Sequence, residues 1–175
     1  MGGFVNTLLK RTELALSGLS VLAVIAVMLI VTADTFMRYV LHAPFSWSFE
    51  LISFYLLIAA THFAVSDTFR EGDHIGVDLL PQSTPKKVQM AMEMMWVVAA
   101  AIVFGIISWG GFDSLYYAYV DNEFLPGIIA WPVWLSHLPI AVGSAVMTLR
   151  LFLHLLNLIA LGTDPEVRTH GDVLE

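Results

Sequence analysis

Four long runs without a charged residue constrain the fold of this sequence more than any other feature. An isolated charge is costly in hydrocarbon, and a helix needs about 20 apolar residues to cross a bilayer core. The runs cover residues 14–33, 51–66, 94–112 and a stretch within 124–149. With short interfacial extensions, they predict transmembrane helices near residues 14–34, 47–67, 92–113 and 131–151. We therefore predict an all-α integral membrane protein, with a four-helix domain over residues 1–161 and a polar tail over 162–175.

The composition agrees with a membrane protein and excludes several other classes. Only 13% of the residues are charged, against about a quarter in soluble domains. The mean hydropathy of +0.77 argues against a soluble enzyme and against disorder. The eight basic residues are spread thinly in a chain of net charge −7, so we expect no nucleic-acid partner. The absence of cysteine removes disulfides, thiolate metal sites and cysteine nucleophiles.

The distribution of basic residues predicts the orientation of the four helices. Basic residues gather in the segments that are cytoplasmic, and both ends of an even number of spans lie on one side. If the N-terminus is inside, the only basic residue in an external loop is Arg38. We therefore predict that both termini are cytoplasmic. The seven basic residues on that side are Lys10, Arg11, Arg70, Lys86, Lys87, Arg150 and Arg168.

Histidines within the predicted spans raise the alternative of a redox membrane anchor. His62 and His137 lie in the second and fourth spans, and imidazole can bind haem or metal. Along two helices that run in the same direction, however, they differ in depth by about 10 Å. We therefore predict no catalytic residue, no metal site and no cofactor. An anchor subunit of a redox enzyme, binding haem or quinone, stays the main alternative.

A small exporter working as a homodimer is the third reading, and it requires an ionisable group deep in a span. The predicted layout instead puts every Asp and Glu near a span end or in a loop. Among these, Asp34 and Arg38 have the i,i+4 spacing of a pair on one helix face. This pair is either a solvated interfacial ion pair or part of a contact with another subunit.

Two segments combine polar and aromatic residues in a pattern that membrane insertion does not explain. The first external loop begins with Arg38-Tyr39-Val40 and ends with Ser46-Trp47-Ser48-Phe49-Glu50. After the second span comes Arg70-Glu71-Gly72-Asp73-His74-Ile75-Gly76-Val77-Asp78, in which apolar and polar residues are interleaved. We expect this second segment to lie on the cytoplasmic interface.

In this order and between these spans, the two segments resemble the small membrane subunit (DctQ type) of the tripartite ATP-independent periplasmic, or TRAP, transporters. The family pattern is an Arg-Tyr-Val-like end of helix one, a Trp-x-x-Glu start of helix two and an Arg-x-Gly-x-His-Ile-x-Val-Asp-like run after it. The resemblance covers about residues 10–160. The matching positions are Arg38, Tyr39, Val40, Trp47, Glu50, Arg70, Gly72, His74, Ile75, Val77 and Asp78.

The resemblance implies a subunit of a transporter in the inner membrane of a bacterium or archaeon, and not an enzyme. Its implied partners are a large membrane subunit and a periplasmic solute-binding protein. In such systems the large subunit carries the sodium and substrate sites, the substrate is usually an organic acid, and the small subunit braces the fixed scaffold. The sequence gives no indication of which organic acid is transported.

Two different roles are possible for Glu50 in this pattern. Near the start of a helix, a glutamate gains from the helix dipole and can cap free backbone amides, as Glu50 would do here. Alternatively, Glu50 meets Arg38 or a cation on the large subunit in a partly dehydrated contact. Trp47 lies three residues earlier, so the two share a face once the helix has begun.

Overall fold

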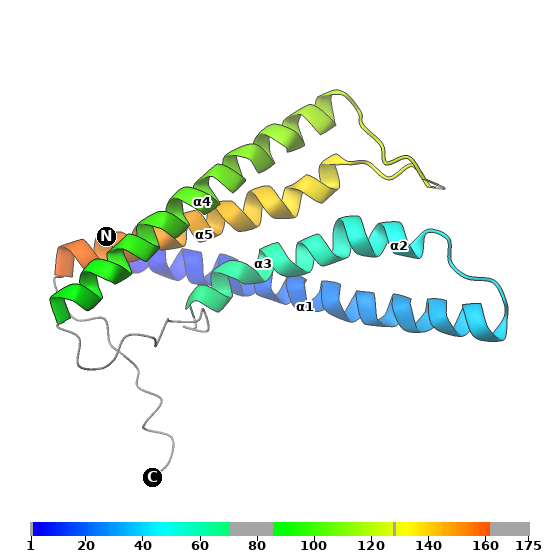
Figure 1. Ribbon diagram of the computed structural model, residues 1–175, viewed down its shortest axis with the longest axis horizontal. Coiled ribbons are helices and arrows are strands. Elements are labelled where there is room, and N and C mark those ends of the chain that lie inside the picture. Colours follow the sequence, from blue (N-terminus) through cyan, green and yellow to red (C-terminus); the bar gives the residue numbers. More distant parts are fainter. Residues whose placement is uncertain (1, 71–85, 128, 162–175) are drawn as a thin grey trace, which may run out of the picture.

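The computed structural model describes residues 2–70, 86–127 and 129–161 (Figure 1). Four stretches are long and apolar enough to cross a membrane, at Thr7–Val40, Ser48–Phe69, Met90–Val120 and Trp134–Ile159. The predicted all-α fold with four membrane-spanning helices is thereby confirmed. The elements are α1 (Gly2–Val40), α2 (Ser48–Leu51), a π-helical turn η1 (Ile52–Leu56), α3 (Leu57–Arg70), α4 (Lys86–Val120) and α5 (Trp134–Leu161).

Two of the helices are much longer than the apolar runs that predicted them. α1 has 39 residues and α4 has 35, which correspond to about 58 and 52 Å of helix. A hydrocarbon core is only about 30 Å thick. The sequence reading ended each span at a charge, but a charged side chain does not interrupt backbone hydrogen bonding. These helices must therefore extend past the hydrocarbon core or cross it at a tilt.

The fourth helix begins at Trp134, three residues after the start of the predicted span at residue 131. The described residues between these helices, 121–127 and 129–133, are held in a small hairpin, and we call them the α4–α5 loop. The amide of Val133 donates to the backbone carbonyl of Glu123, and the amide of Leu125 donates to the backbone carbonyl of Trp131. The loop starts where Asn122, at φ 48°, ends α4 in the left-handed conformation typical of a helix C-terminus.

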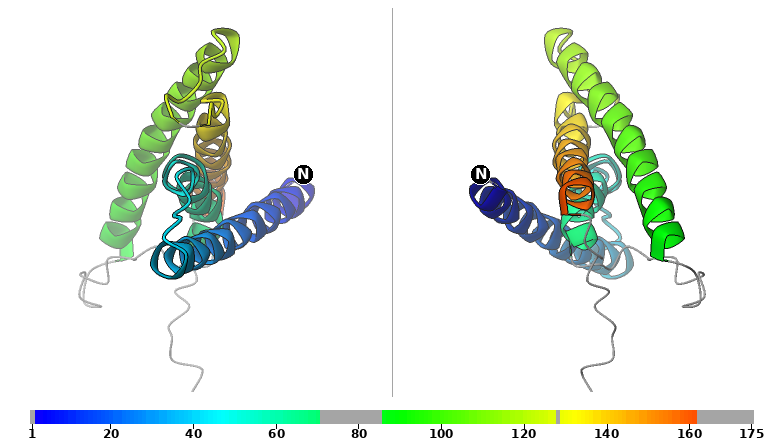
Figure 2. Two further views of the ribbon diagram at one scale, coloured as in Figure 1. Left: turned by 90° about the vertical axis from the view of Figure 1, so that its right-hand side faces the viewer. Right: turned by 90° about the vertical axis from the view of Figure 1, so that its left-hand side faces the viewer.

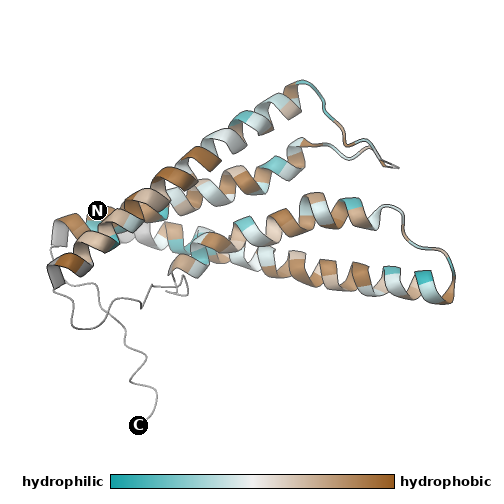
Figure 3. Cartoon of the chain, viewed as in Figure 1, coloured by the Kyte–Doolittle hydropathy of each residue, from teal (hydrophilic) through white to brown (hydrophobic). Residues whose placement is uncertain are grey.

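The helices form an open layer rather than a closed bundle. α3 packs against α1 on one side and α5 on the other, and α4 packs along α5, so the spatial order is α1, α3, α5, α4. The α1–α3 and α4–α5 hairpins meet near the N-terminus and spread apart toward the other end (Figures 1 and 2). We call these the converging end and the splayed end. Apolar residues run along the length of the helices and are not confined to the sides that pack together (Figure 3).

The apolar core lies where the helices converge. Val97 of α4 and Met147 and Leu151 of α5 are buried together there, and Val65 and Phe69 of α3 pack against them. Two glycines allow the backbones to approach closely. A methyl group on Gly111 would lie 3.0 Å from the Cα of Ala141, and one on Gly143 would overlap the backbone carbonyl of His62.

Candidate functional site

A buried polar cluster joins three helices at the converging end. Glu13 of α1 is fully buried, with an exposed fraction of 0%. Its Oε1 accepts a hydrogen bond from the hydroxyl of Ser66 of α3 at 2.8 Å and lies 3.5 Å from Nε of Arg150 of α5. We call Glu13, Ser66 and Arg150 the Glu13 cluster. Because a buried carboxylate requires compensation, this cluster fixes the level at which α1, α3 and α5 meet.

A second polar contact ties α4 to α5 at the same end. Nε2 of His154 lies 3.1 Å from Oε1 of Glu93, and the edge of its ring packs on Phe69 of α3, with ring centroids 5.8 Å apart. Both side chains of the pair are about one-third exposed. The converging end is therefore held by polar contacts that involve all four spans.

Sequence reasoning did not identify the Glu13 cluster. In the sequence, Glu13 only precedes the first uncharged run, and Arg150 is one of the seven basic residues predicted to be cytoplasmic. A signal was available in the predicted topology. Three residues lie at the cytoplasmic ends of their predicted spans, namely Glu13, Ser66 and Arg150. Opposite charges at one depth on different helices are candidates for pairing, but which helices are neighbours cannot be read from spacing.

At the splayed end, Asp34 organises the connection between α1 and α2. Its Oδ2 accepts from Nη2 of Arg38 at 2.9 Å, and its Oδ1 accepts from the amide of Phe45 at 2.7 Å. The predicted i,i+4 pair is thereby confirmed. Phe45 stacks on Trp47 with ring centroids 5.4 Å apart. Asp34 thus holds both the last turn of α1 and the loop that leads to Trp47.

Glu50 lies against the α4–α5 loop, whereas Arg38 pairs with Asp34. A methyl group on Gly127 would overlap the Glu50 carboxylate, which places the two residues in direct contact. One helical turn further on, the hydroxyl of Tyr55, in η1, donates to the carbonyl of Pro132 at 2.8 Å. The Tyr55 ring also packs on Trp131, with centroids 5.8 Å apart. The start of the second span therefore supports the α4–α5 loop and connects the two hairpins at the splayed end.

The remaining residues of the predicted pattern are not brought into one site. Tyr39 is 76% exposed at the end of α1. Arg70 is the last residue of α3. Gly72, His74 and Asp78 lie outside the described residues, as does the predicted tail over 162–175.

The histidines are placed at different levels, as their spacing suggested. Nδ1 of His62 lies 3.1 Å from the carbonyl oxygen of Ile58 on its own helix. Gly143 of α5 packs at the level of His62, and His137 precedes it by six residues, or about 9 Å of helix. The two rings therefore lie on different turns of their helices, which does not suit two axial ligands of one haem.

The arrangement combines contacts at both ends of the helices with apolar faces between them. Polar contacts pin the helices at the converging end, and a loop contact connects the two hairpins at the splayed end. Between them lie apolar helices with large exposed side chains, such as Leu22, Met28 and Leu29 of α1 and Ile106 and Trp109 of α4. Such a layer offers broad apolar faces to lipid or to another membrane subunit.

Comparison with known families gives a match over most of the chain. Residues 27–161 match the family model described as DctQ: Tripartite ATP-independent periplasmic transporters, DctQ component. Comparison with curated proteins finds no match. The matched region begins within α1 and ends with α5, so it includes the splayed end, α4 and most of the converging end. The chain therefore belongs to the DctQ family of TRAP transporter small components, and it is a multi-pass inner-membrane transport subunit rather than an enzyme.

Proposed function

We propose that this chain braces the large membrane subunit of a TRAP transporter during sodium-coupled uptake of an organic acid. A periplasmic binding protein would deliver that acid to the large subunit. The observation that carries the bracing role is the open layer of helices, pinned at one end by the Glu13 cluster and connected at the other by Glu50 and Tyr55. A layer held in this way keeps its shape while leaving wide faces for a partner.

The placement of ionisable groups favours a brace over a carrier. Glu13 and Glu93 lie at the converging end, while Asp34 and Glu50 lie toward the splayed end. Carriers of ions and solutes usually place such groups near the middle of the membrane, on broken helices. Sodium coupling and the organic acid are drawn from the family resemblance.

The bracing role predicts that the chain is necessary for transport but does not transport by itself. Deleting the gene from a strain with the intact system should lower uptake of the organic acid at least tenfold, because the large subunit loses its support. The purified chain in liposomes should take up no solute. Uptake is measured with the radiolabelled substrate, and re-expression of the wild-type chain is the control. Full uptake without the chain, or transport by the chain alone, would contradict the proposal.

The charge bias predicts that the converging end is cytoplasmic. Reporter fusions after Leu161, or at Arg70, should be active only as cytoplasmic reporters, because both positions lie at that end. A fusion at Asn122, in the α4–α5 loop, should be active only as a periplasmic reporter. The two reporter types are compared at matched expression. A cytoplasmic signal at Asn122 would show that the helices are inserted the other way round.

A further inference from the structure

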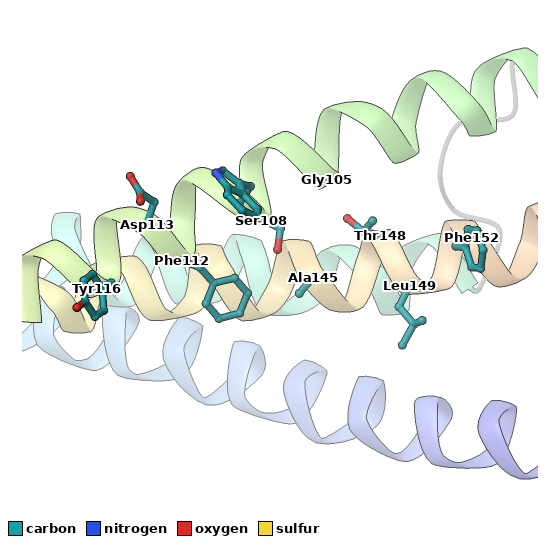
Figure 4. Close-up of a pocket in the computed structure, with 10 residues that line it drawn as sticks. Gly105, Ser108, Phe112, Asp113, Tyr116, Ala145, Thr148, Leu149 and Phe152 are labelled. Atoms are coloured by element: carbon teal, nitrogen blue, oxygen red, sulfur yellow. The ribbon is translucent and has the colours of Figure 1, made fainter.

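A groove runs along one face of α4 and α5 (Figure 4). Its volume is about 760 Å³. Its lining includes two small residues, Gly105 and Ala145. It also includes aromatic residues, among them Phe112 and Tyr116 of α4 and Phe152 of α5. We call this the α4–α5 groove. It lies on the flank of the layer where α4 has α5 as its only neighbouring helix among the described elements.

Asp113 gives the groove a charge that no side chain in the described ranges compensates. The hydroxyls of Ser108 and Thr148 donate to the backbone carbonyls of Ala141 and Ser144, at 3.4 and 2.8 Å. Asp113 is different, because it is exposed and forms no hydrogen bond or ion pair within the described part of the chain. The groove therefore carries a negative charge on its α4 rim.

The depth of Asp113 makes this charge costly without a partner. It lies 20 residues beyond Glu93 on α4, or about 30 Å along the helix, which is the thickness of the hydrocarbon core. The aromatic residues Tyr116 and Tyr117, which suit the membrane interface, follow one turn later. Asp113 therefore lies at the edge of the hydrocarbon, where a cation from another molecule would be strongly favoured.

Two residues near Asp113, Trp109 and Gly105, favour a helix as the occupant of the α4–α5 groove. Trp109 is 80% exposed one turn before Asp113, on the hydrocarbon side. A methyl group on Gly105 would touch only the Thr148 side chain, at 3.9 Å, so packing within this chain does not require glycine there. A glycine on a membrane helix allows the backbone of a neighbouring helix to approach closely.

We propose that the α4–α5 groove receives a transmembrane helix of the large subunit, and that this helix carries a lysine or arginine that pairs with Asp113. This inference rests on the proposed function. The cation also lies within reach of the rings of Trp109 and Tyr116, which attract positive charge. A second copy of this chain is a poorer occupant, because a two-fold contact between grooves would bring two Asp113 carboxylates together.

Charge substitutions test the pairing in the assembled complex. The tagged chain is co-expressed with the large subunit, and the recovered large subunit is quantified at matched membrane expression. Asp113→Lys should lower recovery at least tenfold and Asp113→Asn about threefold, while Asp113→Glu should restore most of it. Asp121→Lys, on an exposed acid of the α4–α5 loop, is the matched control and should leave recovery unchanged. Normal recovery with Asp113→Lys would overturn the pairing.

Cross-linking identifies the occupant directly, because the chain has no native cysteine. Leu149→Cys, in the groove, is labelled with a benzophenone maleimide and illuminated in membranes. Val103→Cys, exposed on α4 but outside the groove, is the control. Leu149→Cys should give an adduct with the large subunit at least fivefold more abundant than Val103→Cys gives. An adduct with lipid or with a second copy of the chain would overturn the assignment. Failure of the wild-type chain to recover any large subunit would contradict the proposed function itself.

Discussion

Replacing Glu13 by alanine is expected to lower the free energy of unfolding by about 3–5 kcal/mol, as is typical when one partner of a buried ion pair is removed. The change removes the acceptor for Ser66 and the carboxylate beside Arg150, whose side chain is only 17% exposed. Equilibrium unfolding in mixed detergent micelles measures the effect. Such a loss is a large fraction of the stability of a protein this size.

An exposed glutamate provides the control for this experiment. Glu123 lies in the α4–α5 loop with its side chain exposed, so Glu123→Ala should change stability by less than about 0.5 kcal/mol. The double variant Glu13→Leu with Arg150→Leu should be less destabilised than Glu13→Ala, because no buried charge is left without its partner. A loss below about 1 kcal/mol for Glu13→Ala would mean that the cluster does not hold the helices together.

Replacing Gly143 by alanine is expected to separate α3 from α5. It should lower the free energy of unfolding by about 1–3 kcal/mol, the usual cost of overpacking. The added methyl would overlap the carbonyl of His62, which belongs to the backbone of α3 and cannot rotate away. The two helices must then move apart along their contact. Unfolding in the same micelles measures the loss, and a cysteine pair across α3 and α5 reports the separation by slower disulfide formation.

Two other glycines serve as controls, because alanine at those positions would not meet the backbone of another helix. Gly18→Ala should be neutral or stabilising by up to about 1 kcal/mol, because nothing lies within 4 Å of the added methyl and alanine favours the helix. Gly127→Ala should cost less than Gly143→Ala, because the atoms that the added methyl meets are at the end of a side chain, that of Glu50, and not in a backbone. Equal losses at all three positions would indicate a general intolerance of alanine rather than a helix contact.

The sequence predicted the Asp34–Arg38 pair but not the surroundings of Glu50. Residues four apart on one helix are neighbours whatever the tertiary fold, so the first pair follows from spacing alone. Glu50 lies against Gly127, which is 77 residues away in the chain. That contact depends on the α4–α5 loop folding back toward α2 (Figure 1), and neither segment indicates this by itself.

The sequence by itself determined the number of spans, their approximate positions and, through the ordered Arg38, Trp47 and Arg70 segments, the family. The number and positions of the spans follow from quantities that act along the chain, namely the thickness of the hydrocarbon core and the cost of a charge within it. The family follows from the resemblance of the ordered motifs. The tertiary structure alone decided that α3 lies between α1 and α5, that Glu13 meets Arg150, and that Asp113 is among the residues lining a groove. Apolar residues cover the helices on all sides, so hydrophobicity does not select a packing face. That choice depends on where small and polar side chains of distant segments meet at the same depth, as Gly143 meets His62.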